Sequence, residues 1–385
     1  AAFSALEYTG YRRFAGAHLF NSMGSQLLQT AMFWQIFDIT GSAILLGLNG
    51  LARAAPHMLL SLVGGVIADR LNRVHLIQWG QVLNAILLVT LGLLTIMGMI
   101  EIWHLYAITF LNSGFSALTQ PARTALIPSL VPRDRLVNAV GLNASVGQVS
   151  QILGPALAGI GIAMLGLGSA YILNAIFYGA AIIGILGITV KDQRETISDG
   201  PWRSFLEGLG FVRQRPVILS LLIMDLSAVV LGSYRALLPI FAELLGTGAA
   251  GYGLLSAAPG VGSLLGAAFI LSLGDMRYKG LYTVFGVLSY SAALALMALS
   301  PWFWLTLIAA GLLGVTNTVQ MIPRNSVILG ISPDALRGRV EAFRSMLAGG
   351  GPPLGYTLSG AVAAVFGAPL AVLLGAITCS VVVVG

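Results

Sequence analysis

Charged residues are scarce in this chain of 385 residues: Asp, Glu, Lys and Arg make up 9% of it, against about 25% in an ordinary soluble domain. Cysteine is almost absent, because Cys379 is the only one, which excludes a disulfide framework and a thiolate metal site. A Walker loop, a Cys/His metal cluster and a Ser-His-Asp arrangement are also lacking, which argues against an ATP-driven pump and a membrane enzyme. So few charges cannot cover a water-soluble surface, and we expect a membrane protein without cofactor or metal.

Apolar segments of helix length fill most of the sequence. Hydrophobic residues make up 57% of the chain and glycine contributes 48 residues; glycine is common in transmembrane helices because it lets backbones approach closely. Polar and Gly/Pro-rich breaks divide the chain into segments near the roughly 20 residues that cross a bilayer. These twelve segments are 13–37, 44–67, 75–98, 104–127, 136–164, 168–190, 216–241, 250–273, 281–299, 302–329, 337–366 and 368–385.

The twelve segments fall into two sets of six on either side of the longest polar stretch. We therefore predict an all-α membrane protein with an N-terminal six-helix half at 1–190 and a C-terminal six-helix half at 216–385. The stretch between them, 191–215, carries apolar residues at helical spacing among charges. It is typical of an amphipathic linker helix on the membrane surface.

The cations of the chain alternate between connections. A net charge of +6 would suggest nucleic acid as a partner of a soluble protein, but here the cations lie before the first segment and in the even-numbered connections, while the odd-numbered ones carry none. This alternation is the positive-inside pattern of a membrane protein, so we expect both termini in the cytoplasm and no nucleic-acid partner. The cations are Arg12, Arg13, Arg70, Arg73, Arg133, Arg135, Lys191, Arg194, Arg203, Arg213, Arg215, Arg277, Lys279, Arg337 and Arg339.

The two halves resemble each other in sequence. Residues 123–132, RTALIPSLVP, match residues 324–333, RNSVILGISP, with the Arg and the final Pro at an offset of 201 in both cases. Gly154-Pro155 in the fifth segment is echoed by Gly351-Pro352 in the eleventh. Six-helix repeats in the same orientation are typical of secondary transporters that bind substrate at the interface of the repeats.

One loop motif carries a family resemblance. Gly65, Asp69, Arg70 and Arg73 match the Gly-x-x-x-Asp-Arg-x-Gly-Arg-Arg motif between spans two and three, although Asn72 replaces the motif's Gly. On these residues and the repeat, the chain resembles the major facilitator superfamily over essentially its whole length. The resemblance implies the twelve-helix major facilitator fold, no enzymatic activity, and a gate in which Asp69 faces another helix's positive N-terminus.

A second motif lies in the fifth segment. Gly147, Gly154, Pro155 and Gly159 look like the glycine- and proline-bearing motif of the family's antiporters, which favours a kinked, close helix interface. Many of these antiporters carry an Arg in the fourth span where this chain has Phe110, which weakens the case for proton coupling through that residue. The whole pattern looks most like the bacterial branch of multidrug and siderophore exporters.

Charges inside the membrane are functional candidates, because each costs at least about 2.5 kcal/mol to insert. Asp225 lies nine residues into its segment, near the midplane, and is the first candidate for proton coupling. Arg53 can hold an anion or a carboxylate, and His57 one turn later can titrate near neutral pH. The alternative for all three is a structural role in pairing or packing helices.

Polar side chains of several segments recur at roughly helical spacing, as expected for residues that line a central cavity. Hydrogen bonding between helices is the competing explanation. The cavity candidates are Gln26, Gln29, Asn112, Gln120, Asn317, Gln320 and Tyr234.

These features together favour a secondary active transporter that exports small amphipathic compounds, drugs or siderophores, in exchange for protons. The alternatives are an uncoupled facilitator and a lipid or lysophospholipid flippase of the same fold. We expect a monomer in the bacterial inner membrane, in contact with lipids, with a small-molecule substrate and protons as its ligands.

Overall fold

The computed structural model describes residues 3–188, 209–274 and 278–384. The side chains of residues 61–70, 334–339, 341, 342 and 345 are outside this description. Most of the predicted linker at 191–215 also lies outside the described residues. Its last part, residues 209–213, is helical, and Val212 is buried against Ile218 and Leu222.

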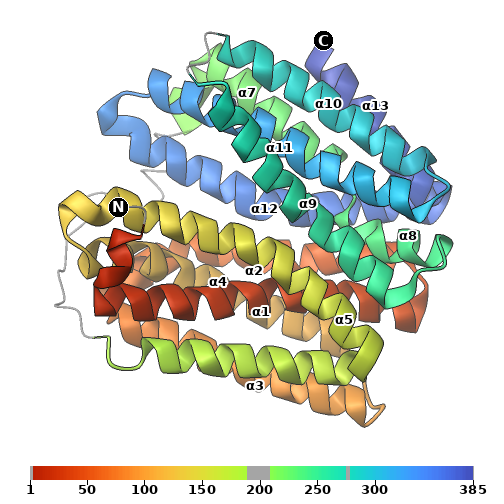
Figure 1. Ribbon diagram of the computed structural model, residues 1–385, viewed down its shortest axis with the longest axis horizontal. Coiled ribbons are helices and arrows are strands. Elements are labelled where there is room, and N and C mark those ends of the chain that lie inside the picture. Colours follow the sequence, from red (N-terminus) through yellow and green to blue (C-terminus); the bar gives the residue numbers. More distant parts are fainter. Residues whose placement is uncertain (1–2, 189–208, 275–277, 385) are drawn as a thin grey trace. The chain divides into compact units, whose positions relative to one another are not determined.

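The N-terminal half forms five long helical elements, the last of which contains two spans (Figure 1). A short 3-10 turn, η1 (Ser4–Glu7), precedes them. The fifth and sixth predicted segments are one continuous element that turns at Gly166, whose φ of 80° is open to glycine and costly for other residues. The helices are α1 (Thr9–Thr40), α2 (Ala43–Arg70), α3 (Arg73–Ile96), α4 (Ile102–Leu130) and α5 (Leu136–Ile185).

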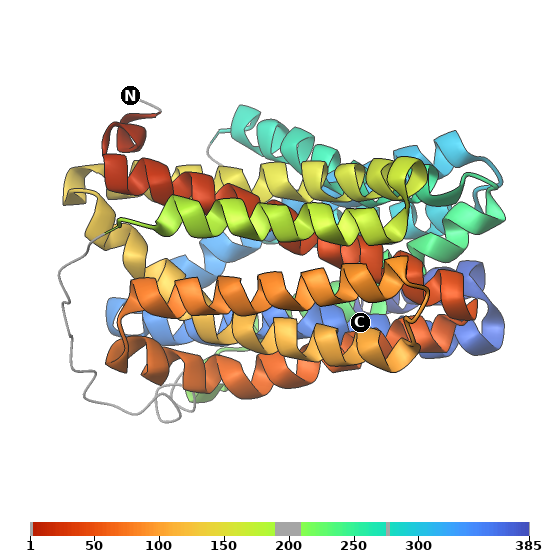
Figure 2. The ribbon, with the colours of Figure 1, turned by 90° about the horizontal axis from the view of Figure 1, so that it is seen from below.

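The C-terminal half adds six more spans, and Figure 2 shows the long helices of the chain as rods joined by short connections. The first of these spans is interrupted: α7 (Pro216–Leu226) passes into a π-helical turn, η3 (Ser227–Leu231), and then a 3-10 turn, η4 (Arg235–Leu237), before α8 (Leu238–Leu244). The others are α9 (Gly248–Ser272), α10 (Lys279–Leu299), α11 (Phe303–Ile331), α12 (Asp334–Phe366) and α13 (Ala368–Val384).

The predicted all-α fold of twelve spans is confirmed, and each helix end lies within a few residues of its expected place. The described residues contain no strand. Seven of their helical stretches are long and apolar enough to cross a membrane by length and composition alone. Of the other spans, α13 is apolar but only 17 residues long.

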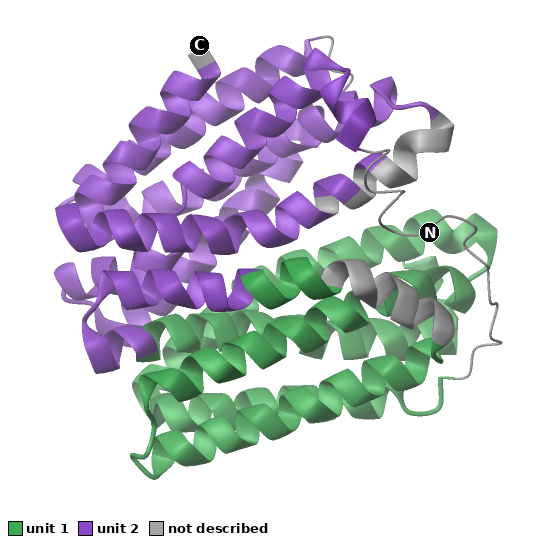
Figure 3. Cartoon of the chain, turned by 180° about the vertical axis from the view of Figure 1, so that it is seen from behind, with its two compact units in different colours: residues 1–35, 55–201 green, residues 36–54, 202–385 purple. Residues whose placement is uncertain are grey.

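The chain forms two compact units, shown in different colours in Figure 3. The first contains residues 1–35 and 55–201, and the second contains residues 36–54 and 202–385. The second unit therefore includes the end of α1 and the start of α2, where Thr357 Oγ1 of α12 donates to the carbonyl of Gly47 at 3.0 Å. The domain boundaries at residues 190 and 216 stay a prediction.

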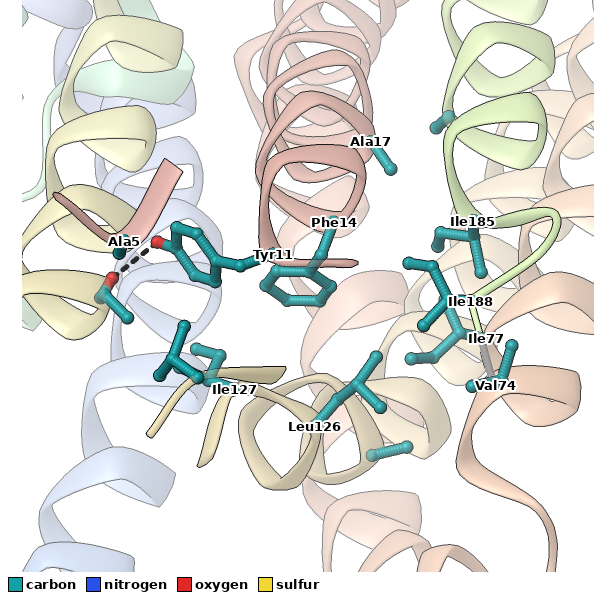
Figure 4. Close-up of a cluster of buried hydrophobic side chains, with 14 residues drawn as sticks. Ala5, Tyr11, Phe14, Ala17, Val74, Ile77, Leu126, Ile127, Ile185 and Ile188 are labelled. Carbon is teal, nitrogen blue, oxygen red and sulfur yellow. Dashed lines mark hydrogen bonds between the residues drawn. The ribbon is translucent and has the colours of Figure 1, made fainter. Parts of the chain in front are cut away.

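One hydrophobic cluster ties the helix ends of the first unit together (Figure 4). Tyr11 and Phe14 of α1 pack among apolar side chains of α3, α4 and α5. The Tyr11 hydroxyl donates to the carbonyl of Ala139 at 2.6 Å, and the Ala5 amide donates to Asn138 Oδ1 at 2.9 Å. These bonds hold the start of the chain against the start of α5. The cluster thus fixes the ends of α1 and α4, the helices that carry several of the polar candidate residues.

Candidate functional site

Equivalent helices of the two halves make equivalent contacts. Arg73, the first residue of α3, donates from Nη1 to the carbonyl of Ala125 in α4 at 3.3 Å. Lys279, the first residue of α10, donates to Ser326 Oγ in α11 at 2.9 Å. The positions 125 and 326 differ by 201, the offset found in the sequence repeat. The repeat is therefore a repeat of structure as well as of sequence.

Close packing repeats in the same register. A Cβ on Gly80 of α3 would lie 2.5 Å from Thr119 Cγ2 of α4, and one on Gly286 of α10 would lie 2.7 Å from Gln320 Cβ of α11. Both glycines are needed for the close approach of the helices, since a side chain there would meet its neighbour. Positions 119 and 320 again differ by 201, so the polar faces of α4 and α11 are held at the same rotation in their halves.

An ion pair lies inside the C-terminal half. Arg324 of α11 donates from Nη1 to Asp225 Oδ1 of α7. Arg324 is 3% exposed, and its Nε has no hydrogen-bond partner in the described part of the chain. The sequence analysis named Asp225 as a proton-coupling candidate and did not anticipate its pairing with Arg324. A buried pair of this kind is sensitive to protonation, because removing the charge of one partner leaves the other uncompensated.

The N-terminal half carries the equivalent arginine with a different partner. Arg123 of α4 donates from Nη2 to Asn21 Oδ1 of α1 at 2.9 Å. Arg123 is partly exposed, but its Nε is buried with no partner among the described residues. Tyr178 of α5 and His18 of α1 lie near enough to interact electrostatically with Arg123. The guanidinium of Arg324 thus donates to a carboxylate, whereas that of the equivalent Arg123 donates to a neutral amide.

Tyrosine side chains lie near Arg235, at the point where the span that begins with α7 is interrupted. Tyr234, a predicted cavity residue, is buried beside Arg235, and Tyr290 of α10 donates to the carbonyl of Gly232 at 3.1 Å. This bond satisfies a backbone group freed where the helix leaves its regular pattern. Broken helices of this kind in transporters occur where the backbone lines a site, so the segment is a candidate part of a binding region in the second unit.

The other predicted cavity residues are not all equivalent. Asn112 of α4 donates to Asn84 Oδ1 of α3 at 2.9 Å, which is the helix-to-helix hydrogen bond given as the alternative. Gln320 donates to Asn317 Oδ1 of its own helix at 3.3 Å, and its buried side chain packs on α10 at Gly286. Gln120 is exposed, and its cavity role stays a prediction.

Four further candidates lie on α1 and α2. The Cβ of Gln26 packs on α5 at Gly154, so this residue stands between two helices of the first unit. Gln29, Arg53 and His57 are partly exposed and each has an interaction partner in the structure. Arg53 belongs to the second unit and His57 to the first. Their roles in coupling or substrate binding stay predictions.

The loop motif lies at the junction of α2 and α3. The side chains of Gly65, Asp69 and Arg70 are outside the described residues, so the expected gate contact of Asp69 stays a prediction. Asn72, which departs from the motif, is the N-cap of α3: its Oδ1 accepts from the amides of Val74 and His75 at 3.0 and 3.2 Å. The substitution of the motif's Gly thus has a structural role, since Asn is a preferred N-cap residue.

The second motif lies along the first part of α5. A Cβ on Gly154 would lie 2.5 Å from Gln26 Cβ and 3.0 Å from the carbonyl oxygen of Met23, so α5 approaches α1 closely here. Pro155 and Gly159 are buried in the same stretch, whereas the Cβ position of Gly147 is open. In the other half, Gly351 of α12 packs on Val229 of η3. The predicted close interface is thus present at Gly154, and its part in transport stays a prediction.

Comparison with known proteins identifies the family. The family model described as "Transmembrane secretion effector", a major facilitator family, matches residues 1–384. The chain belongs to this family. It is an integral membrane transporter of the major facilitator superfamily and not an enzyme, as the sequence analysis predicted.

Curated relatives from enterobacteria extend the match. The chain is 24% identical over 338 residues to the protein named enterobactin exporter EntS of Shigella boydii serotype 4, covering 88% of this chain and 81% of that protein. The protein of the same name from Escherichia coli O81 is 24% identical over 340 residues, covering 88% and 79%.

Solved transporters share the fold at low sequence identity. The nucleoside transporter NupG superposes with a TM-score of 0.75 at 13% identity, covering 97% of both chains. A bacterial homolog of the human lysosomal transporter Spinster superposes with a TM-score of 0.72 at 16% identity, covering 99% of this chain and 94% of that one. At these identities the likeness shows the fold alone.

Proposed function

We propose that this major facilitator protein exports small amphipathic compounds by alternating access in exchange for protons, and that siderophores are among its substrates. The names of the enterobacterial relatives support the substrate class and the direction. We also propose that the protein is a monomer among the lipids of the bacterial inner membrane. The distribution of loop cations supports a cytoplasmic location for both termini.

The observation that carries proton coupling is the ion pair between Asp225 and Arg324. It joins α7 to α11, and α7 leaves regular helical geometry directly after Asp225, at η3. Protonation of Asp225 would cancel one charge of the pair and leave Arg324 uncompensated, which favours a rearrangement of the two helices. A charged pair inside a membrane span has a high cost of insertion and is a functional candidate for that reason.

The test is transport by Asp225→Asn in proteoliposomes. The amide imitates the protonated acid, and it can still accept a hydrogen bond from Arg324, as Asn21 does from Arg123. We expect substrate exchange between equal concentrations to persist, while accumulation driven by a pH gradient falls at least about tenfold, because the variant cannot release a proton. The substrate is a radiolabelled siderophore or a fluorescent amphipathic dye that the unchanged protein accumulates.

Two further variants complete this experiment. Asp38→Asn removes an exposed acid near the end of α1 and should leave gradient-driven accumulation unchanged. The double variant Asp225→Asn with Arg324→Gln removes both charges of the pair. It leaves no uncompensated Arg324, so a loss of gradient-driven accumulation in this variant reports lost coupling rather than poor folding. Undiminished accumulation by Asp225→Asn would exclude Asp225 as the coupling site and favour His57 or the uncoupled facilitator.

A further inference from the structure

The two halves differ at one pair of equivalent arginines. Arg123 lies seven residues before Leu130, the last residue of α4, and Arg324 lies seven residues before Ile331, the last residue of α11. Each donates a hydrogen bond to a side chain from the first span of its half. In the C-terminal half that side chain is the carboxylate of Asp225, and in the N-terminal half it is the amide of Asn21. Asp225 therefore compensates the positive charge of Arg324. Asn21, which is neutral, does not compensate that of Arg123.

Among the described residues, no carboxylate pairs with Arg123. The described residues that interact with it are His18, Asn21 and Tyr178, which are an imidazole, an amide and a phenol. A guanidinium does not lose its proton in a protein, and an isolated charge in a low-dielectric environment is unfavourable. The arrangement therefore lacks an anion.

The same place has unused hydrogen-bonding capacity. The Nε of Arg123 is buried without a partner, and Asn174 of α5 is 0% exposed with neither its amide nitrogen nor its amide oxygen partnered in the described part of the chain. Asn174 is one helical turn before Tyr178, and both residues lie against Gly24 of α1. Arg123 as a whole residue is partly exposed.

We propose that Arg123 and Asn21, with Asn174 one turn away along α5, form a binding site for the carboxylate or phosphate group of a ligand. The ligand's anion takes the place that Asp225 occupies in the other half. The planar fork of a guanidinium matches two oxygens of a carboxylate or phosphate, and an amide nitrogen is a suitable neighbouring donor. This proposal rests on the proposed export function and narrows its substrates: the exported compounds carry an acidic group.

Asn21→Asp is the decisive variant, because it gives the N-terminal half the carboxylate that the C-terminal half already has. The full-length protein in nanodiscs of neutral phosphatidylcholine is unfolded by heat with added benzoate, inorganic phosphate or benzamide. Benzoate and phosphate should raise the unfolding midpoint of the unchanged protein, and benzamide, which has the same shape without the charge, should not.

Asn21→Asp should weaken the apparent affinity for benzoate by at least about tenfold, as expected when a charged hydrogen-bonded contact is lost. Asn21→Ser removes the amide donor without adding a charge, so it should weaken benzoate binding clearly less than Asn21→Asp does. Arg123→Gln serves as a second route if Asn21→Asp does not fold, and it too should abolish the response to benzoate. An equal response of Asn21→Asp and the unchanged protein would overturn the proposal.

A second arm identifies the source of the anion. If nanodiscs containing phosphatidylglycerol raise the midpoint of the unchanged protein but not that of Asn21→Asp, a lipid headgroup occupies the site. If only the soluble anions do so, a soluble ligand is the occupant. The absence of any response to benzoate, inorganic phosphate and phosphatidylglycerol would overturn the site even with transport intact. Anion binding without transport of any compound would instead overturn the proposed function.

Discussion

Single residues decide where the helices of the second unit touch. A Cβ on Gly262 of α9 would collide with the carbonyl oxygen of Gly311 in α11, and one on Gly314 of α11 would collide with the carbonyl oxygen of Pro259 in α9. The two helices thus meet backbone to backbone, and small residues are what permits this in a membrane helix pair. In a bilayer the hydrophobic effect does not drive helices together, so close van der Waals contacts supply much of the attraction between α9 and α11.

Gly262→Ala should therefore destabilise the protein by about 1 to 3 kcal/mol, because a methyl group forces the two backbones apart. The measurement is heat unfolding of the purified protein in detergent. Gly141→Ala is the matched control, since Gly141 lies within α5 with open space at its Cβ position. A midpoint for Gly262→Ala equal to that of Gly141→Ala would show that α9 and α11 tolerate a wider separation.

At the scale of elements, capping explains where α3 begins. Asn72 accepts hydrogen bonds from two of the first amides of the helix, which would otherwise lack partners. Directly after it, Arg73 ties the same end of the helix to α4. The junction of α2 and α3 is thus held by a cap and by a cation, and these two contributions can be separated by mutation.

Asn72→Ala should lower the free energy of unfolding by about 1 kcal/mol, the usual cost of losing an N-cap. Asn72→Gly restores the residue of the family motif and should cost only a few tenths of a kcal/mol, because glycine is a tolerated cap. Unfolding midpoints in detergent compare the two variants. Equal losses would mean that the Asn72 side chain acts through contacts other than the cap.

Much of the element order could be predicted, because the cost of burying polar backbone in lipid fixes both the type and the length of each span. The turn at Gly166 was also expected, since a connection was placed between residues 164 and 168. The π-helical turn at 227–231 was not, because the carbonyl of Gly232, directly after the turn, is satisfied by Tyr290 from a different helix. Hydropathy is insensitive to such a tertiary bond.

The pairing of polar residues was predictable only in part. The sequence repeat aligned Arg123 with Arg324, yet neither the bond of Arg123 to Asn21 nor that of Arg324 to Asp225 was foreseen. Which face of a helix meets which neighbour depends on the rotation of each helix about its axis, and spans that are apolar on most sides encode this rotation weakly.

At the scale of the whole molecule, the loop charges predict the direction of insertion. Met99, in the connection after α3, is 58% exposed, and Leu71, in the connection after α2, is 56% exposed. The two positions are matched in accessibility and lie in connections that the positive-inside rule assigns to opposite sides. The native thiol does not interfere, because Cys379 is 0% exposed.

We expect Met99→Cys to react with a membrane-impermeant maleimide in intact spheroplasts, and Leu71→Cys to react only after the membrane is permeabilised. Mass spectrometry of the purified protein measures the labelled fraction. The unchanged protein, with Cys379 alone, is the control for background reaction. The opposite pattern would reverse the topology and, with it, the proposed direction of export.

The repeated contacts also bear on the history of the chain. If both halves descend from one duplicated gene, then the packing shared by Gly80 and Gly286, and the ties made by Arg73 and Lys279, belong to the ancestral six-helix unit. The partners of the equivalent arginines, Asn21 and Asp225, are different residue types in the two halves. Two identical ancestral units would have given both arginines the same partner, so on that history the unequal charge of the two present pairs arose after the duplication.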